Sequence, residues 1–275
     1  MAFLKADDGI SIYYEQLEPA ARRGATVVFS SAFATTHQNW RGQVEPILAA
    51  GHPVVLWDLR GHGRSDAPTD DRSYSIEHVV ADLLAVANRA SPDAAVVAAG
   101  LSFGGLASLH FMLAHPDRVA ALVLIASGPG FKNPEAAAGW AAQVEGTARF
   151  LETRGFGDFV SGKAAPTCIG SKPELPAARR AAEAICAQSA AGVARFGRRV
   201  AGPAPSVIDD LAGMDVPALV LVGEHDAAFL RAGQVMAAKL PRARHIVIPG
   251  AGHIVNIEEP ALVNEALVAF LGDLV

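Results

Sequence analysis

The chain predicts an α/β fold with a doubly wound, mostly parallel sheet, and three features of the sequence indicate that class. Its short apolar runs of Val, Leu, Ile and Ala are typical of parallel strands that are buried on both faces. Helical stretches separate most of these runs, and this alternation indicates strand–helix–strand units. Hydrophobic residues make up 51% of the 275 residues, which allows a large buried core.

We expect eight strands, of which the first two form an antiparallel pair. Phe3–Lys5 and Ile10–Glu15 alternate in polarity and are joined by a turn at Asp8-Gly9. The parallel strands are expected at about 26–30, 53–57, 94–99, 120–126, 217–223 and 243–248. Helices on both faces of the sheet are expected at about 40–49, 75–89, 103–115, 228–239 and 259–272. Ligands of such a sheet bind beyond the C-terminal ends of its strands.

The alternation stops between Ser127 and about Asp210, in a stretch that is rich in Ala, Arg and Glu. Asn133-Pro134-Glu135 is typical of a helix start, with a capping residue, a proline in the first turn and an acidic side chain. Residues then recur at helical spacing, at Trp140, Val144, Ala148 and Leu151. Further helices are expected at about 176–189 and 193–200.

We therefore expect two parts, a core domain of residues 1–129 and 211–275 and an inserted helical cap at 130–210. A cap of this kind roofs a pocket and excludes water from it. We expect the cap to shape the pocket, with Phe131 and Trp140 as candidate pocket residues, while the chemistry stays in the core. Two stretches that combine Gly and Pro are candidate hinges, Gly128-Pro129-Gly130 and Gly202-Pro203-Ala204-Pro205.

A G-x-S-x-G motif, Gly100-Leu101-Ser102-Phe103-Gly104, lies between an apolar run and a helical stretch. In that context the serine occupies a tight turn with a strained backbone, and the two glycines let the strand and the helix approach closely. The turn presents the Ser102 hydroxyl beside a helix N-terminus, whose free N–H groups favour a developing negative charge. Ser102 is therefore the candidate nucleophile.

A serine hydroxyl needs a base within hydrogen-bond reach and an acid that orients the base. Among nine histidines, His253 stands out because it follows a short apolar strand and a Gly-rich loop. Asp226 follows another buried strand and is the candidate acid, with Glu224 as the poorer second choice. The three candidate catalytic residues thus occur in the order Ser102, Asp226 and His253.

This order resembles that of the α/β-hydrolases, and further motifs extend the resemblance over nearly the whole chain. Asp58–Ser65 is similar to the D-x-R-G-x-G-x-S loop of that family. The stretch 58–68 and the spacing from Ser31 to Trp40 are most similar to the branch of 3-oxoadipate enol-lactonases and small esterases. The resemblance implies an eight-stranded α/β-hydrolase fold. It also favours Asp226 as the acid, since the family's other acid position, after Ala126, offers no carboxylate here.

The chain departs from many α/β-hydrolases at the oxyanion hole. No His-Gly pair follows the strand at 26–30, and the sequence continues as Ser30-Ser31-Ala32-Phe33-Ala34-Thr35. Alignment with enol-lactonase-like turns places Phe33 at the position of the backbone donor, whereas alignment with His-Gly members places Ala32 there. Either residue can serve, because the donor is a backbone amide. The second donor is expected to be the N–H of Phe103.

Several other polar and aromatic residues are expected to have structural roles. Asp58 should hold the Gly-rich loop that contains Arg60 and His62. Trp40 should pack its helix against the core, while His37 is a candidate for the mouth of the pocket. A group of arginines in the cap is expected to form a solvated face, or alternatively to attract acidic substrates, at Arg179, Arg180, Arg195, Arg198 and Arg199.

Composition excludes several classes of partner. The formal net charge of −5 argues against nucleic acid and against an anionic membrane surface. We expect no signal peptide and no membrane span, and hence a cytoplasmic protein. Without an oxidising compartment, Cys168 and Cys186 are expected to be free thiols. No motif implies a metal or nucleotide cofactor, and the oligomeric state is not indicated.

Taken together, these features predict a serine hydrolase without cofactors that acts on a small ester or lactone. The same triad also supports carbon–carbon bond hydrolysis, perhydrolysis or hydroxynitrile-lyase-like chemistry. A low-turnover receptor for a small ligand, which retains the triad, is the alternative from another class. Pocket shape sets the substrate, and pocket shape does not follow from periodicity.

Overall fold

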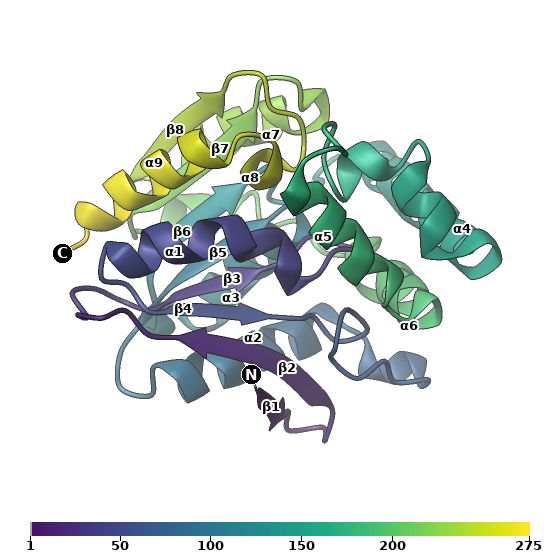
Figure 1. The fold of residues 1–275 in the computed structure, drawn as a ribbon, viewed down its shortest axis with the longest axis horizontal. Coiled ribbons are helices and arrows are strands. Elements are labelled where there is room, and N and C mark those ends of the chain that lie inside the picture. Colours follow the sequence, from purple (N-terminus) through teal and green to yellow (C-terminus); the bar gives the residue numbers. More distant parts are fainter. Residues whose placement is uncertain (1) are drawn as a thin grey trace.

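In a computed structural model, which describes residues 2–275, eight strands form one twisted sheet in the order β1-β2-β4-β3-β5-β6-β7-β8 (Figure 1). β2 (Ser11–Leu17) pairs antiparallel with β1 (Ala2–Lys5) and with β4 (Val54–Trp57). The other described pairs are parallel, and they involve β3 (Val27–Ser30), β5 (Val96–Leu101), β6 (Val119–Ile125), β7 (Ala218–Gly223) and β8 (Ala243–Ile248). The predicted mostly parallel, eight-stranded sheet is confirmed.

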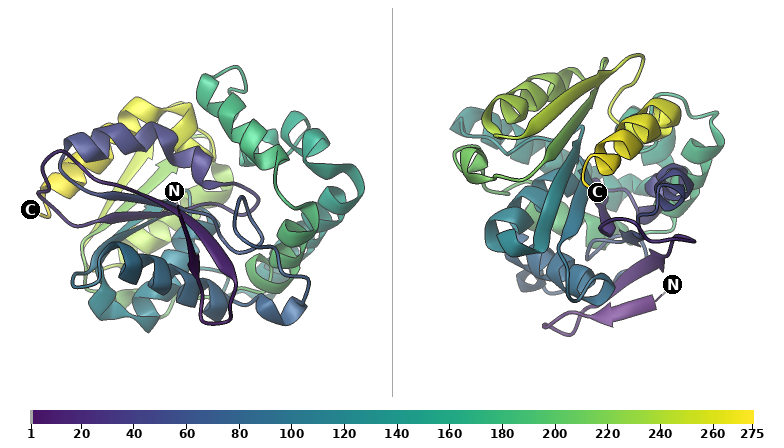
Figure 2. Two further views of the ribbon diagram at one scale, coloured as in Figure 1. Left: turned by 60° about the horizontal axis from the view of Figure 1, so that its bottom comes forward. Right: turned by 90° about the vertical axis from the view of Figure 1, so that its left-hand side faces the viewer.

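The central strands are buried on both faces because helices cover the sheet on each side (Figure 2). α1 (Arg41–Ala49) and α9 (Pro260–Gly272) pack against each other on one face. α2 (Ile76–Ala90), α3 (Phe103–Ala114) and α7 (Ala227–Lys239) contribute to the core on the other face. Alternate strand residues enter the two cores, so Val28 faces one of them and Phe29 the other.

The helices between β6 and β7 lie beyond one end of the sheet (Figure 1). They are α4 (Pro134–Ser161), α5 (Pro176–Cys186) and α6 (Ala190–Phe196), followed by a π-helical turn at Gly197–Ala201. α5 ends three residues earlier than predicted, because the Ser189 side chain accepts a hydrogen bond from the N–H of Gly192 and caps α6 instead. The remaining short helices are His37–Trp40, Asp71–Ser73, Pro116–Arg118, Ala165–Thr167, Leu211–Gly213 and Val255–Glu258.

Strand order places the candidate site. In the sheet, β3 lies between β4 and β5, the two strands that follow it in the chain. The chain therefore adds β4 on one side of β3 and β5 on the other, and the direction of winding reverses at β3. Ligands of doubly wound sheets bind at this reversal, beyond the C-terminal ends of the strands. Ser30 at the end of β3 is in register with Gly100 of β5. The turn that follows β3 therefore lies beside the turn that carries Ser102.

Two further features of the structure concern its helices and its cysteines. None of the helices that the structure describes is long and apolar enough to cross a membrane. Both cysteines are free thiols, with Cys168 buried and Cys186 exposed. Burial raises the pKa of the Cys168 thiol to about 12, which disfavours the reactive thiolate at neutral pH.

Candidate active site

The turn at Ser102 has the strained geometry that its motif predicts. Ser102 has φ 53° and ψ −116°, a conformation that costs a residue with a side chain about 1–3 kcal/mol. A Cβ on Gly100 would lie 2.1 Å from the carbonyl carbon of Gly104, and a Cβ on Gly104 would lie 2.1 Å from the carbonyl oxygen of Ser30. Only glycine therefore fits either position, and the close packing of β3, β5 and α3 fixes the serine between them.

The candidate acid and base are hydrogen-bonded to each other. His253 Nδ1 lies 2.8 Å from Asp226 Oδ2, and the Asp226 side chain is buried. Because Nδ1–H donates to the carboxylate, neutral His253 leaves its Nε2 lone pair free to accept a proton. Glu224, the second choice for the acid, instead accepts a hydrogen bond from the N–H of Gly250 and is exposed.

Ser102, Asp226 and His253 all line one cavity of about 690 Å³. Within residues 2–275 the Ser102 hydroxyl has no hydrogen-bond partner, so its bond to His253 is not formed in this structure. Such contacts are often long in the absence of substrate and tighten when substrate binds. The structure thus brings the three predicted residues to one site, with the acid–base pair already joined.

Backbone donors face the same cavity from two turns. Phe103 is the first residue of α3, where an N–H has no partner inside the helix, and Ala32 and Phe33 line the cavity from the turn after β3. In the part of the chain that the structure describes, the N–H groups of Ala32, Phe33 and Phe103 have no acceptor. The N–H of Ala34 is already used, because it donates to His62 Nε2 at 3.1 Å. The structure keeps both predicted positions, Ala32 and Phe33, available.

The cavity has the size of a small-molecule pocket and a mostly apolar wall. Phe131 and Trp140, the two predicted pocket residues, both line it, and their rings lie 6.1 Å apart. The indole N–H of Trp140 donates to the carbonyl of Ala201 at 2.8 Å, which fixes the ring orientation. Part of the wall therefore comes from α4 and its neighbours, beyond the end of the sheet.

Sequence reasoning missed other parts of the wall. Phe229 lies in the first turn of α7, and its ring is 4.8 Å from that of His253. Its position three residues after Asp226, on the same helical face, is a signal that could have revealed it. Lys163 lies exposed at the edge of the cavity and is its one positively charged lining residue among those described. No pattern in the sequence marks Lys163, because it follows the end of a helix in an irregular stretch.

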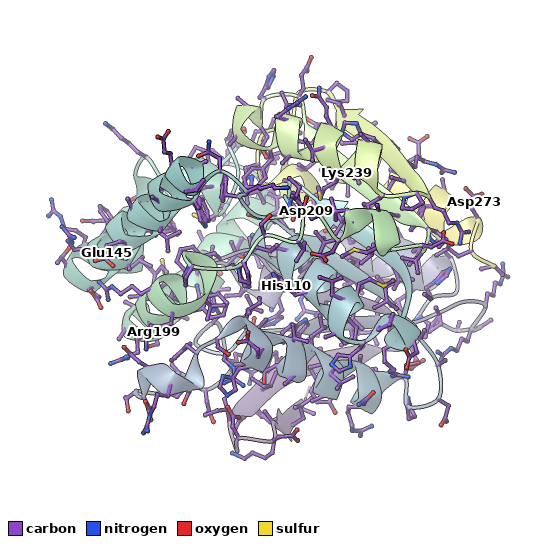
Figure 3. The ribbon with its side chains drawn as sticks, turned by 180° about the vertical axis from the view of Figure 1, so that it is seen from behind. His110, Glu145, Arg199, Asp209, Lys239 and Asp273 are labelled. Atoms are coloured by element: carbon purple, nitrogen blue, oxygen red, sulfur yellow. The ribbon has the colours of Figure 1, made fainter. Side chains whose placement is uncertain are left out.

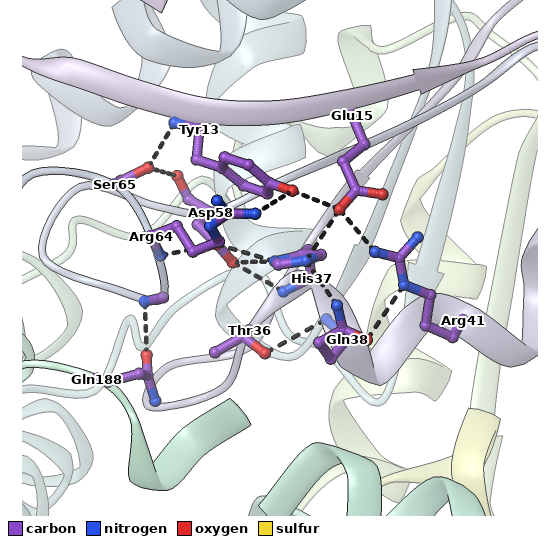
Figure 4. A network of polar contacts seen from close by, with 11 residues as sticks. Tyr13, Glu15, Thr36, His37, Gln38, Arg41, Asp58, Arg64, Ser65 and Gln188 are labelled. Atoms are coloured by element: carbon purple, nitrogen blue, oxygen red, sulfur yellow. Dashed lines mark hydrogen bonds and ion pairs between the residues drawn. The ribbon is translucent and has the colours of Figure 1, made fainter. Parts of the chain in front are cut away.

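The Gly-rich loop after β4 is held as predicted by Asp58 (Figure 4). Its carboxylate accepts hydrogen bonds from the backbone N–H of His37 at 2.8 Å and of Arg64 at 2.9 Å. A Cβ on Gly63 would lie 2.2 Å from Asp58 Oδ2, so only glycine fits there. Arg60 is buried and paired with Asp82. Asp58 thus joins the segment after β3 to the loop after β4.

His37 does not line the pocket mouth, which corrects the candidate role suggested for it from sequence. It is buried between Asp58 and Glu15, at 2.9 Å and 3.3 Å from their carboxylate oxygens (Figure 4). Burial alone would lower the pKa of His37, but the hydrogen bonds to Asp58 and Glu15 outweigh it and raise the pKa. Trp40, as predicted, is fully buried and packs on Phe29 with ring centroids 4.4 Å apart.

Three of the five arginines predicted to form a group between β6 and β7 are ion-paired, namely Arg195, Arg198 and Arg199. Arg198 binds Glu145 and Glu152, each at 2.7 Å. Arg199 lies 3.8 Å from Asp71, and Figure 3 shows Glu145 and Arg199 on the helices that lie beyond the sheet. None of the five arginines lines the cavity, and Arg198 and Arg199 are partly exposed. The expected solvated face does not extend to Arg180, whose Nε is buried without a hydrogen-bond partner among residues 2–275. No cluster of three or more His, Cys, Asp or Glu side chains that could hold a metal occurs within residues 2–275.

Comparison with known proteins adds to this geometry. A family model described as the alpha/beta hydrolase fold matches residues 25–260. A Bacillus subtilis (strain 168) protein, named provisionally as a 2-succinyl-6-hydroxy-2,4-cyclohexadiene-1-carboxylate synthase, is 26% identical over 98% of this chain and 97% of its own. A solved esterase from Thermogutta terrifontis has a TM-score of 0.85 and 25% identity, covering 100% of this chain and 99% of the esterase. The enol-lactonase from Burkholderia xenovorans LB400 has a TM-score of 0.83 and 25% identity, covering 98% and 100%.

Proposed function

This chain belongs to the alpha/beta hydrolase fold family, and from that premise we propose that it is a serine hydrolase that cleaves a small ester or lactone. The observation that carries the proposal is the hydrogen bond between His253 Nδ1 and Asp226 Oδ2, in the same cavity as the strained Ser102. A nucleophile, a base and an orienting acid in one apolar cavity are the parts that acyl transfer requires.

In the proposed reaction, Ser102 Oγ attacks the carbonyl carbon while His253 Nε2 takes its proton. Asp226 holds the imidazole in the tautomer that accepts at Nε2 and stabilises the imidazolium that forms. The N–H of Phe103 and that of Phe33 or Ala32 donate to the oxyanion of the tetrahedral intermediate. His253 then returns the proton to the leaving group, and a water molecule, activated by the same histidine, releases the acid from the acyl-enzyme.

We propose that residues 130–210 act as a cap over this reaction. α4 supplies Trp140 and Val144 to the cavity wall, while the proposed triad lies on elements of the sheet region. An apolar roof excludes water that would otherwise weaken the electrostatic interactions at the oxyanion. The cap would thus determine which acyl groups fit, with the triad unchanged.

A second candidate is a reaction other than ester or lactone hydrolysis on the same three residues, of which carbon–carbon bond hydrolysis is one example. The observation that favours it is the full-length similarity to a relative whose name describes a carboxylate synthase and not an esterase. The two candidates share the nucleophile, the base and the oxyanion donors, and they differ in the bond that is cleaved. Only the substrate distinguishes them.

The decisive experiment is a panel of acyl esters of graded chain length and lactones of graded ring size, assayed with the purified protein. We expect at least one member to be hydrolysed with kcat/KM of about 10⁴ M⁻¹s⁻¹ or more, which is the ordinary range for an enzyme on its own substrate class. A folded protein that reacts with a serine probe but turns over no ester or lactone would contradict the proposal and favour the second candidate.

The same panel tests the cap. Trp140→Leu removes most of an indole from the cavity wall, so longer acyl chains should gain room relative to short ones. One methylene in an apolar pocket is worth about 1–3 kcal/mol, so the long-to-short ratio of kcat/KM should rise by about 10–200-fold. Phe150→Leu is the matched control, because Phe150 lies on the same helix but does not line the cavity. An unchanged chain-length preference in Trp140→Leu would contradict the role of the cap.

A further inference from the structure

The turn after β3 is held by two side chains that the reaction above does not use. Its last residue, Ala34, has φ 64°, a left-handed conformation that is unfavourable for any residue with a Cβ. The N–H of Ala34 donates to His62 Nε2 at 3.1 Å, and its carbonyl accepts from Gln188 Nε2 at 3.2 Å. Both polar groups of this strained residue are therefore fixed, directly after the two amides that are candidates for the oxyanion hole.

His62 is suited to hold the N–H of Ala34. Its side chain is buried, and burial lowers its pKa to about 4, so the ring is neutral at physiological pH. Nδ1 lies 3.2 Å from the carbonyl oxygen of Arg60 and must carry the proton, because that oxygen can only accept. Nε2 is thereby left as the acceptor that the N–H of Ala34 requires.

Gln188 connects three segments through one amide group. Its Nε2 donates to the carbonyl of Ala34, and its Oε1 accepts from the N–H of Gly63 at 2.9 Å (Gln188 is labelled in Figure 4). Gln188 itself lies between α5 and α6, in the helical segment beyond the sheet. That segment packs tightly on the same loop, since a Cβ on Gly61 would lie 2.9 Å from the carbonyl oxygen of Gly192.

We propose that Gln188 is a positioning residue that couples the helical segment beyond the sheet to the oxyanion hole. This inference rests on the proposed function. Gln188 holds the carbonyl of Ala34 while His62 holds its N–H, and together these bonds fix the backbone directly after the N–H groups of Ala32 and Phe33. Strained turns persist only when their surroundings over-determine them. A misplacement of about 1 Å at a reacting centre can lower a rate by about 10²-fold.

The coupling changes how the helical segment contributes to the reaction. From sequence we expected it to shape the pocket only, with the chemistry confined to the rest of the chain. Within the described residues, the hydrogen bonds of Gln188 go to Gly63, Ala34 and Ile185 and not to the proposed triad, whose three residues lie outside the segment. A movement of the loop between α5 and α6 would nevertheless release the Ala34 carbonyl and loosen the oxyanion turn.

Three variants test the proposal. Gln188→Met keeps the length of the side chain and loses both hydrogen bonds. Gln188→Glu keeps an acceptor for Gly63 and loses the donor to Ala34. Ser189→Ala is the matched control, because it removes the cap of α6 at the adjacent residue without a contact to Ala34. Circular dichroism and thermal melts establish that each variant is folded.

With the best substrate of the panel, both Gln188 variants should lower kcat by about 10–100-fold and leave KM within about threefold. A trifluoromethyl ketone forms a tetrahedral adduct with the serine. Its affinity should fall in the Gln188 variants by about the same factor as kcat/KM falls. Ser189→Ala should melt at a lower temperature and keep kcat within about twofold. The tetrahedral analogue distinguishes positioning of the oxyanion donors from a general loss of structure.

Equal losses of kcat in Ser189→Ala and Gln188→Met would overturn the coupling, since packing of the loop would then explain both. A rise of KM with unchanged kcat would also overturn it. These results are distinguishable from failure of the proposed function. An active wild type with normal Gln188 variants contradicts the coupling alone, whereas a wild type without ester or lactone turnover contradicts the function.

Discussion

Ser102→Ala is expected to lower kcat by about 10⁴–10⁶-fold and to abolish covalent labelling by a fluorophosphonate probe. The reason is that the three proposed catalytic residues act as a unit, so removal of the nucleophile costs nearly all of their joint contribution. The change should be tolerated by the fold, because alanine retains the Cβ and the hydroxyl has no partner within the described residues. Mass spectrometry of the labelled protein and steady-state kinetics on the best panel substrate measure the two effects.

Ser108→Ala is the matched control for this experiment. Ser108 lies on α3, six residues after Ser102, and its buried hydroxyl donates to the carbonyl of Gly104 and not into the cavity. The variant should label at the rate of the wild type and keep its kcat. Labelling that persists in Ser102→Ala would remove the central claim, because another nucleophile would then have to carry the reaction.

Much of this fold could be predicted from sequence because it depends on local pattern. The strands β3 to β7 are apolar runs, buried on both faces almost throughout, so they leave no alternation to misread. The strained turn was predictable because the G-x-S-x-G motif at residues 100–104 lies between an apolar run and a helical stretch. The structure adds the reason for the two glycines, since a Cβ on Gly100 or Gly104 would collide with backbone. The resemblance to the esterase and enol-lactonase branch is likewise supported by the two structures that superpose over nearly the whole chain.

Contacts between distant segments could not be predicted in the same way. Gln188 meets Ala34 across 154 residues, and His37 meets Asp58 across 21 residues. Nothing in the local sequence of Gln188 distinguishes it from a solvent-exposed helical residue. His37 was misplaced for a related reason, since burial beside Glu15 depends on the strand order of β2 and β4 and not on the neighbours of His37 in sequence.

Asp226→Asn is expected to lower kcat by about 10³–10⁴-fold while the protein remains folded. The asparagine side chain has nearly the same shape, but its amide group can donate to Nδ1 of His253, which moves the imidazole proton to Nε2. That tautomer cannot accept the proton of Ser102. The carboxylate that stabilises the imidazolium is lost at the same time. Steady-state kinetics of the variant, with thermal melts as the check on folding, measure the effect.

Glu224→Gln is the matched control, because Glu224 lies two residues before Asp226. Like Asp226, it accepts a hydrogen bond from the loop that carries His253. Its acceptor role toward the N–H of Gly250 can be kept by the glutamine carbonyl, so kcat should stay within about threefold of wild type. A large loss in Glu224→Gln beside a small loss in Asp226→Asn would assign the acid to Glu224 instead. That reversal would require the His253 loop to rearrange in solution, since Nδ1 lies 2.8 Å from Asp226 Oδ2 here and Glu224 is bonded to Gly250 instead. The pair of variants therefore tests the geometry of the site as well as the role of one carboxylate.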